Sequence, residues 1–129
     1  MIFFINNNIY CQQKPLTYHA VQMQTILESS GFSKGWENVD LYVQFYITNS
    51  KLDSIIINKG KHIGVIIKEL KSKYKIGNTF YDIYTGYDDV IAEDLEIRWE
   101  LFSKNRTDEA GKLTIKYTDF TINIKLSNK

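Results

Sequence analysis

The last third of the chain, residues 95–126, carries the pattern that most restricts the fold. Over residues 95–101, apolar side chains alternate with charged ones, and a two-residue period is the signature of a β-strand with one buried face. The same alternation recurs over 113–117 and, with its phase moved by one residue, over 120–126. These segments predict three strands that form an antiparallel meander with one continuous apolar face.

The turns of this meander predict its register. With a two-residue turn at 118–119, Ile115 lies opposite Ile122. With a loop over 104–111, the same scheme places Trp99 opposite Ile115. The three side chains then share one apolar layer, which the rest of the chain has to cover.

Upstream of the meander, the pattern predicts two helices and several shorter strands. The first helix begins after Thr17, a favourable N-cap residue, and runs to about Ser29. The second runs from His62 to Tyr74, where apolar residues recur at intervals of three and four residues, the spacing of one helix face. Further strands are expected at 2–5 and 9–12 as a hairpin, and at 39–47, 54–57 and 79–84, with an acidic connection over 85–94.

This order of elements is typical of an α+β domain. A chain of 129 residues is long enough for one hydrophobic core and short for two, so we expect a single domain over residues 1–129. The predicted fold is an antiparallel sheet of about five to seven strands that ends in the three-stranded meander, with both helices packed on one face.

Composition narrows the classes of partner. The formal net charge is +1, and the basic residues are 14 lysines and only two arginines. Because arginine is the side chain suited to bidentate phosphate and guanine contacts, nucleic acid is not the expected partner. The single cysteine, Cys11, cannot form an internal disulfide, residues 1–5 lack the basic leader of a signal peptide, and no apolar run approaches the ~20 residues of a membrane helix. We therefore expect a cytoplasmic protein with no membrane contact.

The two signs of charge are separated along the sequence. Residues 51–75 contain seven lysines and two acidic residues, whereas residues 82–100 contain seven carboxylates and one arginine. Such poles can steer a charged partner, but they can also pack against each other or face solvent. The acidic stretch is the first candidate surface, because its tyrosines are of the type enriched at interface hot spots. The candidate partner-binding residues are Asp82, Tyr84, Tyr87, Asp88, Asp89, Glu93, Asp94 and Glu96.

The basic stretch is the alternative candidate surface. Lys59 and Lys61 flank Gly60 just before the expected second helix, and a helix start with free amide groups can bind an anion. The stretch is not a P-loop, because the first glycine and the Ser or Thr after the lysine are absent. The alternative anion-binding residues are Lys59, Lys61, Lys68, Lys71 and Lys73.

The sequence contains no motif that is typical of an enzyme active site or of a metal site. The carboxylates of residues 88–94 lack the ligand alternation and the central glycine of an EF-hand loop. Cys11, His19 and His62 match no nucleophile motif. We predict no catalytic residue, no cofactor and no metal site.

In composition, a small domain rich in Ile, Lys, Asn and Tyr with opposed charge segments resembles bacterial immunity proteins, which are antitoxin-type proteins that neutralise a toxin by binding it. The resemblance implies a protein-binding module whose acidic segment occludes the active site of a basic toxin, such as a nuclease, aided by charge complementarity. The alternative is a small-ligand or nucleic-acid binding domain that uses the lysine-rich second helix. Phosphate binding of that kind would weaken steeply with salt.

Overall fold

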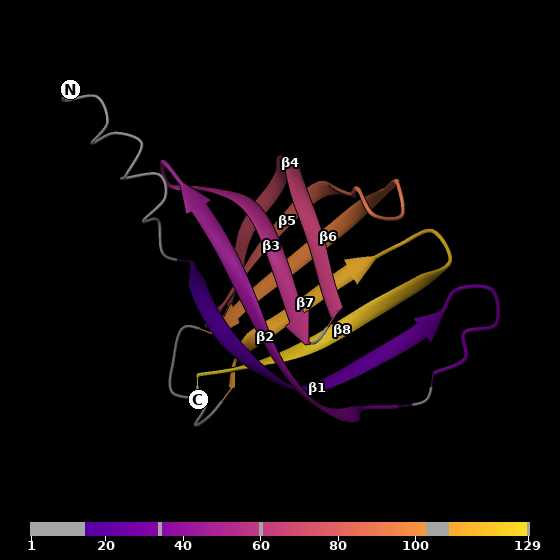
Figure 1. The fold of residues 1–129 in the computed structure, drawn as a ribbon. Helices are drawn as coiled ribbons and strands as arrows, with labels where there is room; N and C mark the ends of the chain where they lie inside the picture. The colour runs from indigo at the N-terminus through magenta and orange to yellow at the C-terminus, as the bar shows by residue number, and fades with distance from the viewer. Residues whose placement is uncertain (1–14, 34, 60, 103–108, 129) are drawn as a thin grey trace.

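The computed structural model is a closed antiparallel β-barrel (Figure 1). It describes residues 15–33, 35–59, 61–102 and 109–128. Each strand pairs with the next one along the chain, and the first pairs with the last, which closes the sheet. The strands are β1 (Leu16–Leu27), β2 (Glu37–Thr48), β3 (Lys51–Lys59), β4 (Lys61–Ile76), β5 (Thr79–Asp88), β6 (Glu93–Phe102), β7 (Glu109–Lys116) and β8 (Phe120–Ser127).

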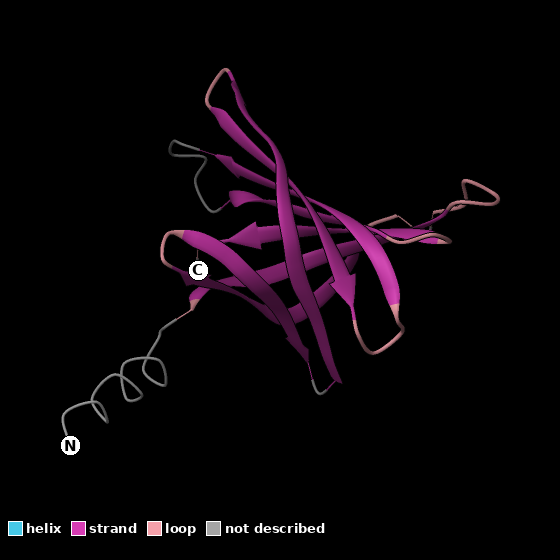
Figure 2. Ribbon diagram, turned by 90° about the horizontal axis from the view of Figure 1, so that it is seen from above, coloured by secondary structure: helices cyan, strands magenta, loops and turns pink. Residues whose placement is uncertain are grey.

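The α+β prediction and its two helices are wrong. Viewed from above, the described chain consists of strands, turns and loops (Figure 2). The segment expected to form the first helix, 17–29, is mostly β1, and the segment expected to form the second, 62–74, lies within β4. The sheet also has eight strands, more than were expected.

β-bulges explain part of the helix-like spacing of β4. The register between β4 and β5 shifts between Ile67 and Glu69 and again between Leu70 and Ser72. Each bulge inserts one residue and moves the side chains that follow into the opposite phase. Ile67 and Leu70 therefore lie three apart on the same face, an interval that is also found on a helix face. Ile63 and Ile66 are also three apart, but no bulge separates them, and in a regular strand such positions fall on opposite faces. β1 has a similar irregularity between Ala20 and Gln22.

The other expected strands that fall within the described residues are present, but they are longer than the pattern indicates. The acidic connection expected over 85–94 is mostly strand, because β5 continues to Asp88 and β6 begins at Glu93. The hairpin expected over 2–5 and 9–12 lies outside the described residues. The segments 39–47, 54–57 and 79–84 lie within β2, β3 and β5.

The C-terminal meander is confirmed, with one error of register. Ile115 pairs with Ile122 as expected, whereas Trp99 pairs with Leu113 and not with Ile115. A shift of two residues leaves every side chain on its original face, so the apolar pattern cannot distinguish the two registers. Trp99, Ile115 and Ile122 all lie in the one buried core.

Apolar side chains fill the interior of the barrel. Phe45 of β2 stacks on Trp99 of β6 with ring centroids 3.9 Å apart and planes at 13°. These two strands are four apart in a ring of eight, so the stack crosses the interior. An eight-stranded barrel is about wide enough for side chains to fill, which leaves the ends and the wall as places for a binding site.

The wall of the barrel opens where β4 leaves β3. The two strands pair only from Lys59 and Lys61 to Ser54 and Ile66. Beyond that point, residues 67–76 of β4 pair with β5 on one side and with no strand of the described chain on the other. The first bulge of β4 lies at this divergence, and bulges bend the strand that carries them. We call this opening, with residues 51–53 on one side and 67–76 on the other, the flank.

A substitution at Gly111 tests how closely the backbones of β6 and β7 approach each other. Its backbone lies so close to β6 that a Cβ atom would overlap the carbonyl oxygen of Glu100. Because backbone cannot move aside, we expect Gly111→Ala to lower the free energy of unfolding by about 3 kcal/mol, measured by chemical denaturation. Replacement of the exposed Lys116 by Ala is the control and should have little effect. Equal stability of the two variants would contradict the close approach.

Candidate functional site

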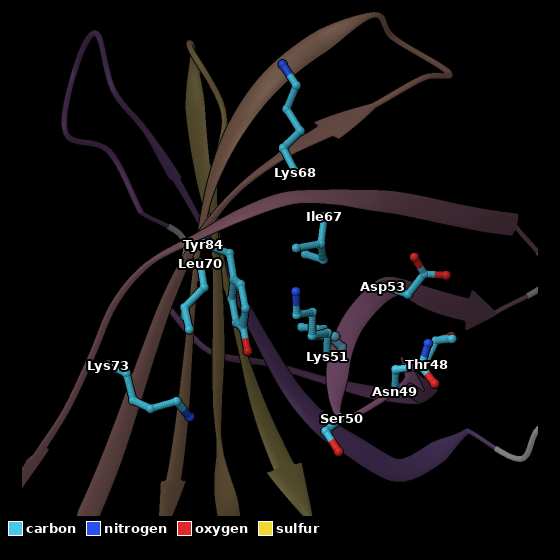
Figure 3. A pocket seen from close by; sticks show the side chains of 11 residues that line it. Thr48, Asn49, Ser50, Lys51, Asp53, Ile67, Lys68, Leu70, Lys73 and Tyr84 are labelled. Atoms are coloured by element: carbon cyan, nitrogen blue, oxygen red, sulfur yellow. The ribbon is translucent and has the colours of Figure 1, made fainter.

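The flank contains a hollow of about 580 Å³ (Figure 3). Its lining comes from the turn between β2 and β3, the first residues of β3, the free part of β4, and Tyr84 of β5. A volume of this size is within the range of sites for small molecules. The hollow therefore marks the flank as the candidate site.

A tight turn sets one side of the hollow. Asn49 and Ser50 have positive φ angles of 52° and 66°, which is the conformation of a type I′ hairpin turn. Asparagine tolerates this left-handed region better than most residues. The turn pairs Thr48 with Lys51 and so fixes where the Lys51 side chain enters the hollow.

Apolar groups line the other side. Ile67 and Leu70 of β4 line the hollow together with Tyr84, which lies directly across from Leu70 in β5. Leu70 is 46% exposed although the Tyr84 residue is buried. An apolar side chain left half in water beside an unpaired strand is a surface that a ligand or partner can cover.

The lysines of the hollow differ in how far they are neutralised. The Lys73 ammonium donates to both carboxylate oxygens of Asp82, at 3.0 and 3.2 Å. The Lys68 side chain points away from the hollow (Figure 3) and donates to Asp94 at 3.0 Å. Lys51 has no carboxylate partner among the described residues, and Figure 3 places its side chain in the middle of the hollow. Lys51 is therefore the cation available to an anionic ligand.

The hydroxyl group of Tyr84 is held as a hydrogen-bond donor. It donates to the Asp82 carboxylate at 3.3 Å, and the Asp82 side chain is itself only 14% exposed. Burial is the main cause that raises the pKa of Tyr84, and the negative charge and hydrogen bond of Asp82 raise it further. The site thus offers an ammonium group, a neutral phenol and an apolar surface, which suit binding.

Asp88, one of the expected partner-binding residues, is buried and structural. Its carboxylate accepts hydrogen bonds from the Tyr117 hydroxyl and from the Val90 amide, each at 3.0 Å, and a longer one from the Ile91 amide at 3.4 Å. These bonds cap the turn between β5 and β6 and tie it to the end of β7. Asp88 is not available to a partner.

The structure does not bring the other seven expected residues onto one surface. Asp82 and Tyr84 lie on the inner face of β5, since their cross-strand partners Trp99 and Ile97 are in the core. Glu93 accepts a hydrogen bond from the Thr118 amide. The remaining four are on the outside: Asp94 pairs with Lys68, Tyr87 lies 5.8 Å below that lysine, and Asp89 and Glu96 are exposed.

The alternative set of lysines is partly assembled. Lys68 and Lys73 line the flank, and the exposed Lys71 lies at the second bulge of the same strand. Lys59 and Lys61 pair with each other at the far end of β3 and β4, away from the flank. Because this region is a strand, the expected helix N-terminus for an anion does not exist.

Sequence reasoning missed Lys51 and Leu70, although both lie in the charged segment. The one available signal was the turn at Asn49 and Ser50, which brings Lys51 back beside β2. The exposure of Leu70 follows from the bulges and the missing strand partner, which no local pattern indicates.

Comparison with known proteins gives no relative for this chain: no family model, curated protein or solved structure matches it. Among the described residues, no group of three or more His, Cys, Asp or Glu side chains is arranged to hold a metal ion. The described part of the chain also has no helix with the length and apolarity to cross a membrane. The flank is therefore interpreted from its own chemistry.

Removal of the Asp88 carboxylate should destabilise the barrel. We expect Asp88→Ala to lower the free energy of unfolding by about 2 to 3 kcal/mol, because it leaves the Tyr117 hydroxyl and two amides without an acceptor. Thermal and chemical denaturation measure the change. Asp89→Ala, at the adjacent exposed position, is the matched control and should be close to the native protein. A larger loss for Asp89 than for Asp88 would contradict this assignment.

Two tyrosines should make the barrel sensitive to alkali. Burial raises the pKa of Tyr84 and of Tyr117, with further contributions from Asp82 and Asp88 respectively. Unfolded tyrosine titrates near pH 10, so the folded state holds these protons more tightly. Their contribution to stability is fully present below about pH 10 and is lost as pH rises through the folded-state pKa.

The double variant Tyr84→Phe and Tyr117→Phe should therefore lose less stability than the native protein between about pH 9 and 11, as measured by urea denaturation at each pH. Tyr42→Phe, at a residue 53% exposed, should keep the native alkaline loss. An unchanged loss in the double variant would show that these two groups do not cause it.

Proposed function

We propose that this protein is a non-catalytic binding module that takes a protein partner at the flank. The observation that carries the proposal is the free edge of β4, since residues 67–76 have a strand neighbour on one side only within the described chain. Backbone amide and carbonyl groups along such an edge are free to pair with another chain. Recognition by an added strand is a recurrent mode of peptide binding.

Exposed apolar side chains support a macromolecular partner. Along the free part of β4, Leu70 is 46%, Tyr74 is 39% and Ile76 is 63% exposed. Exposed apolar groups that gather on one element are typical of interaction sites. A partner strand laid along this edge would cover them and pair the free backbone at the same time.

The biological setting that we propose is neutralisation of a toxin in the cytoplasm. The compositional resemblance to immunity proteins supports this role, and the lone Cys11 requires no oxidising compartment. The contact surface differs from the one expected from sequence, because Asp88 is buried and Asp82 and Asp94 are paired with lysines. We assign the partner to the flank in place of the acidic segment.

A second candidate function is the binding of a small anionic molecule in the hollow. The specific observation in its favour is Lys51, whose side chain lies in the middle of the hollow and has no carboxylate partner in the described chain. Such a ligand would combine a carboxylate or phosphate group with an apolar body that contacts Leu70 and Ile67.

Site-specific photo-cross-linking in cells that express the partner separates the two candidates. A benzophenone side chain placed at Leu70 or Ile76 should form a covalent adduct with one protein, identified by mass spectrometry. The same group at the exposed Lys116, on β7, is the control and should form none. Absence of an adduct at both flank positions would contradict the protein-binding role. Retention of a small molecule in native mass spectrometry would then favour the second candidate.

A further inference from the structure

We propose that the flank binds an extended, acidic segment of the partner as an additional strand on β4. The inference rests on the proposed function and adds the chemistry of the partner. Three properties of the free edge carry it: its unpaired backbone, its lysines and its apolar side chains.

The unpaired backbone sets the conformation of the bound segment. Residues 67–76 pair with β5 except at the two bulges, at Lys68 and Lys71, so most of their backbone is already extended and held in place. Only an extended chain can satisfy the opposite edge, because strand pairing requires amide and carbonyl groups at regular intervals. The partner segment must therefore bind as a strand.

The positive charge of β4 favours acidic residues in the bound segment. The free part of β4 carries four lysines and one carboxylate, Glu69. Asp94 neutralises Lys68 and Asp82 neutralises Lys73. Lys71, Lys75 and the nearby Lys51 have no carboxylate partner among the described residues. Carboxylates on the partner strand would complete these pairs, whereas lysines would be repelled.

The same lysines argue against a second copy of this chain as the occupant. Two β4 edges paired with each other would place lysine-rich strands side by side, and like charges across a strand pair are destabilising. Lysines and bulges on edge strands are devices that prevent self-pairing, and β4 has both at Lys68 and Lys71. A foreign acidic strand satisfies the edge without this repulsion.

Apolar side chains of β4 require apolar residues in the partner as well. Leu70 and Ile67 line the hollow beside Tyr84, and successive residues of a strand point to opposite faces. A segment in which apolar and acidic residues alternate can therefore direct its apolar side chains into the hollow while its carboxylates, on the opposite face, approach Lys71, which is exposed and does not line the hollow. This alternation is the sequence feature that we infer for the partner.

The probe for this inference is a capped synthetic peptide of about ten residues in which valine and glutamate alternate. We expect it to bind the full-length protein and to protect amides of residues 67–76 from hydrogen exchange. Lys71→Glu should weaken binding about tenfold, measured by fluorescence anisotropy, while Lys116→Glu, on the exposed face of β7, should bind as the native protein does. Circular dichroism confirms that both variants fold. Equal affinities of the two variants would overturn the role of charge.

Two N-methylated forms of the peptide test backbone pairing. Each has every second amide methylated, in one of the two possible phases, and an edge strand uses the amides of one phase only. We expect one form to lose binding and the other to retain it. Equal binding of the two forms would overturn the strand assignment, because contacts of side chains alone do not distinguish the phases.

Other outcomes separate this inference from the proposed function. A cross-linked partner at Leu70 together with no binding of the acidic peptide would reject the acidic strand and leave the protein-binding role intact. Absence of both would reject both. Dimerisation of the isolated protein with protection at 67–76, seen by sedimentation and hydrogen exchange, would assign the edge to a second copy and overturn the inference.

Discussion

The stack of Phe45 on Trp99 is the contact on which the rest of the structure depends. It joins β2 to β6 across the barrel, and the pairing of β1 with β8 closes the sheet around it. A ligand inside the barrel would have to displace this stack and the apolar side chains that surround it. Because the interior is filled in this way, binding has to take place at the ends or on the wall, and the wall opens where β3 and β4 diverge.

The bulges of β4 contribute both to the failed helix prediction and to the flank. The first bulge places Ile67 and Leu70, which share the inner face, three residues apart, an interval that is also typical of a helix face. This bulge, at Ile67 to Glu69, lies where β4 separates from β3. Alternation in β2 and in the C-terminal meander was interpreted correctly as strand, because the register shifts of these strands lie near their ends. In β1 and β4 the shifts lie within the strand, and these are the two segments that were assigned to helices.

The separation of basic and acidic segments along the sequence is real, but the sequence does not show that the two segments pair with each other in the fold. The basic and acidic segments become neighbours because β4 and β5 form one hairpin and β6 follows it. Two ion pairs, Lys73 with Asp82 and Lys68 with Asp94, join them. The lysines available to a partner are those that have no carboxylate opposite them in the neighbouring strands. The sequence does not specify the register of β4, β5 and β6, so it could not show that Lys71 and Lys75 lack a carboxylate partner among the described residues.

The free edge of β4 combines two requirements that usually conflict. It has to stay open for a partner, but an open edge invites pairing with any extended chain. The bulges make the edge irregular, and the lysines repel a second copy of the same strand. Both features leave an acidic strand as the favourable neighbour, because it gains the backbone pairing and the charge contacts together. Selectivity at this edge therefore comes from residues that act against self-pairing as much as from those that attract a partner.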